Sequence, residues 1–154
     1  MTQTSLDDVQ GLNCLIAKFE RRVELLKQVL ELAQRQRKCV EQSKTERLDR
    51  LIQCGEHSLR QWRVLERELC AALKSARTGT LTDEDKARLS ASIAKSEALA
   101  EAINRENGRT GEAITSRSEA ITSELQEVRK ARATLHAYAP EPSPTRKANI
   151  DTNA

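Results

Sequence analysis

The chain has 154 residues, of which 32% are charged and only 2% are aromatic, and its formal net charge is +3. Strands favour aromatic and β-branched residues, whereas Leu, Ala, Glu, Gln, Arg and Lys dominate here, as is typical of long helices. The small net charge, with acidic and basic residues mixed along the chain, argues against a nucleic-acid-binding protein. No run of 18 apolar residues occurs, so we expect no membrane insertion.

The start of the chain and its cysteines indicate a cytoplasmic protein. MTQTSLDDVQ contains neither the basic segment nor the apolar core of a signal peptide. The four cysteines form no C-x-x-C pair, and a reducing compartment would keep them as thiols. Cys54 and His57 stand one helical turn apart, but a structural zinc site needs four ligands. We therefore expect no metal.

The first predicted helix carries a heptad seam, the signature of helices that pack at a shallow angle. Its apolar residues recur at alternating steps of three and four, interrupted only by Arg37. Further leucines and a valine widen the stripe, as a helix with two neighbours requires. The seam comprises Val9, Leu12, Ile16, Phe19, Val23, Leu26, Leu30, Ala33 and Val40, and the widening residues are Leu15, Leu25, Val29 and Leu32.

A capping box is predicted at the start of the second helix. In SKTE, Ser43 would accept a hydrogen bond from the amide of Glu46, whose carboxylate would reach back. Trp62 is the predicted anchor of the core. The seam of this helix comprises Leu48, Ile52, Leu59, Trp62, Leu69 and Leu73, with Leu51 and Leu65 beside it.

The third predicted helix begins after Thr82, a good N-cap, and its acidic first turn suits the helix dipole. Its seam is weaker, because polar residues occupy several positions. The apolar members are Leu89, Ile93, Ala100, Ile103, Ile114, Ile121, Val128 and Leu135, and the polar members are Ser96, Asn107, Thr110, Arg117 and Glu124.

The lengths of the three segments leave two alternatives open. The first two span roughly 50 Å each and the third, from about residue 83 to 137, roughly 80 Å. The third either breaks near Gly108–Gly111 and folds back, or runs on with Ile121, Leu125, Val128 and Leu135 uncovered. Uncovered apolar stripes mark partner surfaces, but these residues could also complete the bundle core or a homodimer seam.

The predicted fold is thus all-α, an antiparallel bundle of three long helices over residues 1–139 with a flexible Pro-rich tail over residues 140–154. The sequence has no Gly-rich phosphate loop, no G-x-S-x-G, no H-E-x-x-H and only two His. We therefore expect a protein that is not an enzyme and needs no cofactor.

Weak helix formers interrupt the third segment. Asn104, Asn107, Gly108 and Gly111 together give up roughly 3 kcal/mol of helix propensity. The stretch INRENG resembles the Asn-x-x-Asn-Gly motif of the FlgN family, small cytoplasmic chaperones of flagellar type III export. The residues that match are Asn104, Asn107 and Gly108 of the motif, Ile114, Ile121 and Leu125 of the apolar stretch that follows, and Tyr138 near the end of the helical region.

The resemblance implies a function. Such chaperones bind the C-terminal amphipathic region of hook–filament junction proteins and present them to the cytoplasmic domain of the membrane export gate. The resemblance and the uncovered stripe together predict these partner-binding residues: Asn104, Asn107, Gly108, Ile114, Ile121, Leu125, Val128 and Leu135. By the resemblance, Tyr138 would be the gate contact. The chain departs from the family in Arg109, Thr110 and Gly111, where members commonly carry bulky apolar residues. The alternative is a self-associating coiled-coil structural or adaptor protein with no export role.

Overall fold

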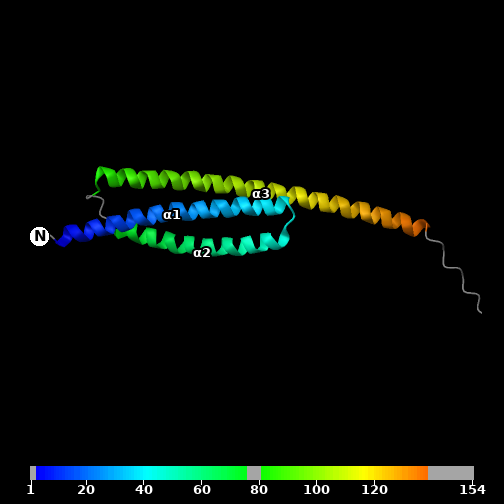
Figure 1. Ribbon diagram of the computed structural model, residues 1–154, viewed down its shortest axis with the longest axis horizontal. Coiled ribbons are helices and arrows are strands. Elements are labelled where there is room, and N and C mark those ends of the chain that lie inside the picture. Colours follow the sequence, from blue (N-terminus) through cyan, green and yellow to red (C-terminus); the bar gives the residue numbers. More distant parts are fainter. Residues whose placement is uncertain (1–2, 76–80, 139–154) are drawn as a thin grey trace, which may run out of the picture. The chain divides into compact units, whose positions relative to one another are not determined.

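Three long helices make up the structure, a computed structural model that describes residues 3–75 and 81–138. They are α1 (Gln3–Glu41), α2 (Thr45–Ser75) and α3 (Asp83–Tyr138), and the described residues contain no strand (Figure 1). The predicted all-α fold is confirmed. The predicted tail, residues 140–154, lies outside the described residues. The chain divides into two compact units, Met1–Arg117 and Ser118–Ala154, and α3 contributes to both.

Within the first unit, α1 and α2 run antiparallel and pack closely along their lengths (Figure 1). Ile16 is the most deeply buried large side chain. Seven members of the seam predicted for the first helix are confirmed as buried: Leu12, Ile16, Phe19, Val23, Leu26, Ala33 and Val40. Leu30 is half-buried, and the side chain of Val9 lies outside those that the structure describes. The central cluster joins Leu15, Phe19 and Leu25 of α1 to Leu65 and Leu69 of α2, and Trp62, Ala72 and Leu89 pack against it.

The seam predicted for α2 is wrong in part. Leu69 of the predicted seam and Leu65 beside it are buried, but Ile52, Leu59 and Leu73 of the seam are exposed. Ser58, which the seam did not include, is buried. The physical reason is that α1 is the helix against which α2 packs closely. One neighbour covers only one side of a broad apolar stripe, so the other side stays at the surface.

The turn between α1 and α2 corrects the predicted capping box. Ser43 has a φ of 55°, a left-handed conformation, whereas an N-cap residue adopts an extended one. The amide of Ser43 donates to the carbonyl of Val40 (3.1 Å) and the amide of Lys44 donates to the carbonyl of Cys39 (2.9 Å). This pair of bonds is a Schellman motif, so Ser43 ends α1 rather than beginning α2.

The N-terminus of α3 is capped as predicted. The amide of Asp85 donates to the hydroxyl of Thr82 (3.1 Å), and that hydroxyl donates to the Asp85 carboxylate (2.7 Å). α3 then continues without interruption through Gly108 and Gly111 to Tyr138. Of the two alternatives that the sequence leaves open, the structure therefore shows the continuous helix.

Ion pairs and small side chains join α3 to α1 within the first unit. Arg88 of α3 pairs with Glu20 of α1 at 2.7 Å. Ser92 and Ser96 are buried, and the Ser96 hydroxyl donates to the carbonyl of Ser92 at 2.9 Å. Each buried serine needs little space between the helices. The Ser96 hydroxyl bonds within its own helix and therefore needs no partner from α1.

Candidate partner-binding site

All of the predicted partner-binding residues lie on α3, but they fall into the two units. Those of the motif and Ile114 belong to Met1–Arg117, whereas Ile121, Leu125, Val128, Leu135 and Tyr138 belong to Ser118–Ala154.

The motif residues Asn104, Asn107 and Gly108 are exposed, as is Gly111. A Cβ atom added at Gly108 or at Gly111 would meet nothing within 4 Å. Neither glycine has a positive φ. No neighbour among the described residues and no backbone conformation therefore requires these glycines, and their small size leaves an open surface on α3.

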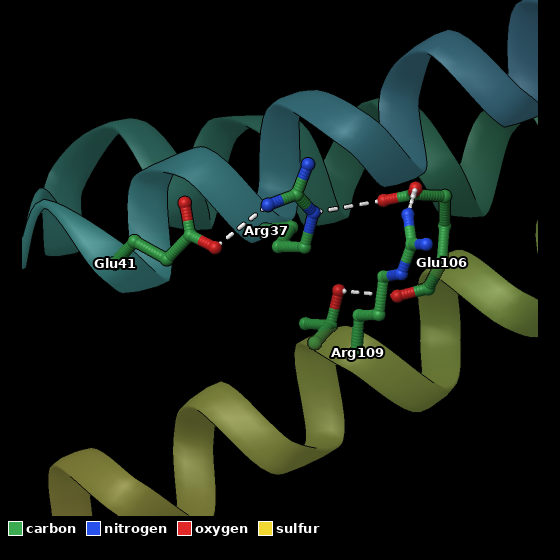
Figure 2. A network of polar contacts seen from close by, with 5 residues as sticks. Arg37, Glu41, Glu106 and Arg109 are labelled. Carbon is green, nitrogen blue, oxygen red and sulfur yellow. Dashed lines mark hydrogen bonds and ion pairs between the residues drawn. The ribbon is translucent and has the colours of Figure 1, made fainter.

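Glu106, between the two motif asparagines, is instead buried, with a relative exposure of 7%. Its two carboxylate oxygens bind different arginines (Figure 2): Arg37 Nε of α1 donates to Oε2 at 2.9 Å, and Arg109 Nη1 donates to Oε1 at 2.9 Å. Arg37 Nη1 also donates to Glu41 Oε1 at 2.7 Å. The four side chains form a continuous polar network that joins α1 to α3.

The network favours the charged form of each central group. The hydrogen bond from Arg37 lowers the pKa of the Glu106 carboxyl, and Arg109 adds to this effect against the opposing effect of burial. The hydrogen bond with Glu106 in turn raises the pKa of Arg37. Both groups are therefore charged at neutral pH, and the pair holds α3 against α1 next to the exposed motif.

Sequence reasoning missed Glu106, although it contained a signal for it. Arg37 is the residue that interrupts the apolar seam of the first helix, and a charge on a buried face needs a partner of opposite sign. That partner is an acidic residue on another helix. The sequence offers many candidates, and only the packing of α3 on α1 selects Glu106.

In the second unit, a row of apolar side chains occupies one side of α3. Ile121, Leu125, Val128 and Leu135 follow one another at steps of four, three and seven residues, which places them on the same helix face. All four are exposed, from 45% for Ile121 to 71% for Leu135. They are not part of the buried core. We call these four residues the late apolar row; Tyr138, the last residue of α3, is 83% exposed.

Ile114, which the sequence analysis grouped with these residues, belongs to the first unit and is also exposed. Ile52, Leu59 and Leu73 of α2 are further exposed apolar residues of that unit. Beyond the helical hydrogen bonds of their backbone, the side chains of Asn104 and Asn107 make no hydrogen bond to another described residue.

Residues 3–75 and 81–138 offer no metal site and no membrane-spanning helix. Cys54 is exposed, and the His57 ring lies 3.1 Å from the Gln61 amide. Within these ranges no group of three or more His, Cys, Asp or Glu could hold a metal ion. None of the described helices has a stretch long and apolar enough to cross a bilayer.

Comparison with known proteins identifies a family. The family model described as FlgN protein matches residues 11–145, which covers most of the 154-residue chain. No curated protein and no solved structure matches the chain.

Proposed function

Because the chain belongs to the FlgN family of flagellar export chaperones, we propose that it binds the C-terminal amphipathic region of hook–filament junction proteins in the cytoplasm. It would shield that region until export and deliver the bound protein to the type III export gate. The chemistry is non-covalent binding, without catalysis or a cofactor.

The observation that carries this proposal is the late apolar row. A helix with apolar side chains at i, i+4, i+7 and i+14 offers anchors along one face, and an amphipathic helix of a partner buries its own apolar face against such anchors. Contiguous exposed apolar surface of this kind marks sites of protein–protein interaction. The continuity of α3 supports the proposal, since an unbroken helix presents the anchors in one line.

The expected affinity is moderate. A cargo segment that orders on binding loses conformational entropy, which lowers its affinity per unit of buried area. Such binding suits a chaperone that must release its cargo at the gate without hydrolysing a nucleotide.

The test is a triple substitution on the late apolar row. Ile121→Asp with Leu125→Asp and Val128→Asp should abolish co-purification of a hook–filament junction protein, because three charges on the face oppose the burial of an apolar helix. Far-UV circular dichroism should stay helical, since all three residues are exposed. The matched control places Asp at Ser123, Gln126 and Lys130, away from the row, and should keep the cargo. Cargo capture by the row variant would contradict the proposal.

We propose Tyr138 as the contact with the export gate, by its resemblance to the tyrosine of family members. Its side chain is highly exposed, so it is available to a partner. Tyr138→Ala should leave cargo binding intact and weaken binding to the cytoplasmic domain of the gate. Loss of cargo binding in this variant would instead assign Tyr138 to the cargo surface.

A further inference from the structure

An arginine occupies a position inside the late apolar row. The steps from Ile121 to Leu125 and on to Val128 are four and three residues, and the next two such steps lead to positions 132 and 135. Position 135 is Leu, but position 132 is Arg. Alternating steps of four and three keep residues on one helix face, so Arg132 lies on the same face as the four apolar side chains.

Arg132 has no acidic neighbour in its own helix. The residues three and four positions away are Val128, Arg129, Leu135 and His136. Arginines elsewhere in the chain do pair at this spacing, as in Arg35–Glu31, Arg37–Glu41 and Arg109–Glu106. No ion pair joins Arg132 to another of the described residues.

The surroundings of Arg132 are also positively charged. Besides Arg132, residues 128–138 contain Arg129, Lys130 and His136 and no acidic residue. Basic residues stabilise a helix C-terminus through the helix dipole, but that effect is confined to about the last turn, and Arg132 lies before the last turn of α3, which ends at Tyr138. The helix dipole therefore does not account for the charge at this position.

A helix that covers the row would remove water from Arg132. A guanidinium that loses water without gaining a partner is strongly unfavourable, whereas a carboxylate can accept two parallel hydrogen bonds from it. We propose that the helix bound by this face carries an Asp or Glu within its own apolar row, placed against Arg132. This inference rests on the proposed function and adds a charge requirement to it, so that Arg132 determines which amphipathic helices are accepted.

Two synthetic peptides test the charge requirement against the full-length chain. Both are amphipathic helices of about 20 residues, long enough to form helix on binding, with Leu at steps of four and three. One has Glu at the central row position and Gln on the opposite face, and the second exchanges these two residues. The peptides thus have the same composition and net charge, and a central Glu can reach Arg132 in either direction of binding.

The expected result, by fluorescence anisotropy, is that the peptide with Glu in the row binds about tenfold more tightly than its isomer. Arg132→Gln should bring the two affinities together. Arg132→Glu should reverse the preference. Lys130→Glu is the matched control, because Lys130 lies two residues from Arg132 and on another face of the helix, and it should keep the preference.

The outcomes separate this inference from the proposed function. Equal binding of both peptides to the wild-type chain would show that Arg132 extends its long side chain to solvent and would overturn the charge requirement alone. Undiminished binding to the Ile121→Asp, Val128→Asp variant would overturn the docking face itself. Failure of both peptides to bind the wild-type chain would overturn the face and the charge requirement together.

Discussion

Glu106 connects the exposed motif of α3 to α1 through Arg37, and its ionisation should make stability depend on pH. Its pKa is lowered in the folded state by the hydrogen bond from Arg37. A carboxyl with a depressed pKa stabilises the fold at pH values above its unfolded pKa, and this contribution is lost as the pH falls through the folded value.

We therefore expect Glu106→Gln to lower the melting temperature at pH 7. The difference from the wild type should begin to shrink as the pH falls below the ordinary Glu pKa of about 4.3, because the unfolded chain then binds a proton. It should be lost as the pH falls through the lower folded pKa, where the Glu106 carboxylate is protonated as well. Thermal denaturation followed by circular dichroism over a pH series measures this. Glu119→Gln is the control: Glu119 is exposed, and its substitution should leave the melting temperature unchanged across the pH series. A pH-independent difference would assign Glu106 a packing role only.

The motif glycine Gly108 should be replaceable as far as stability is concerned. It lies inside a helix with open space at its Cβ position, and Ala is favoured over Gly in a helix interior by roughly 1 kcal/mol. Gly108→Ala should therefore stabilise the chain by about 0.5–1 kcal/mol in urea denaturation, and Gly111→Ala should act in the same direction. Destabilisation would mean that the backbone at this point is not an ordinary helix interior.

At the scale of the element, α2 shows how far periodicity predicts a buried face. Two leucines six residues apart, Leu59 and Leu65, were both expected in or beside the seam, yet Leu59 is 53% exposed and Leu65 only 3%. Periodicity identified the apolar side of the helix. It could not identify which edge of that side α1 would cover, because this depends on the rotation of one helix against the other.

The two leucines give a direct test of the packing. Leu65→Ala should cost about 2–5 kcal/mol, the range for a buried Leu that leaves a cavity. Leu59→Ala in the same helix should cost less than about 1 kcal/mol, since its side chain is already in contact with solvent. Chemical denaturation of both variants measures the two changes in the free energy of unfolding. Equal costs would indicate that a second copy or another segment covers Leu59.

The side of α2 that faces α1 also carries charge. Arg22 of α1 stands over the Trp62 ring at 5.0 Å and pairs with Glu66 at 3.2 Å. The Arg22 Nε and Glu66 Oε1 atoms are buried and do not reach hydrogen-bond geometry, so their attraction is that of the charges alone. The half-buried Trp62 therefore anchors the edge of the core in two ways: it packs against the core cluster, and its ring holds the Arg22 guanidinium.

At the scale of the whole molecule, the alternative function makes a measurable prediction. A chaperone with an open face should be a monomer of 17.3 kDa by light scattering when no cargo is present. A self-associating coiled-coil protein would give a stable dimer through its exposed apolar residues. A dimer that dissociates after Ile121→Asp and Val128→Asp would show that a second copy occupies the late apolar row, in favour of the alternative.

The sequence by itself determined the three helices, because helix periodicity, the Thr82 cap and the absence of proline before residue 140 are properties of local segments. It also determined family membership, through the pattern over residues 11–145. The tertiary structure decided which edge of α2 is buried, that Ser43 ends α1, and that Glu106 pairs with Arg37, which lies 69 residues away in the sequence. The physical reason is that burial and ion pairing between helices depend on their mutual rotation and register, which no local segment contains.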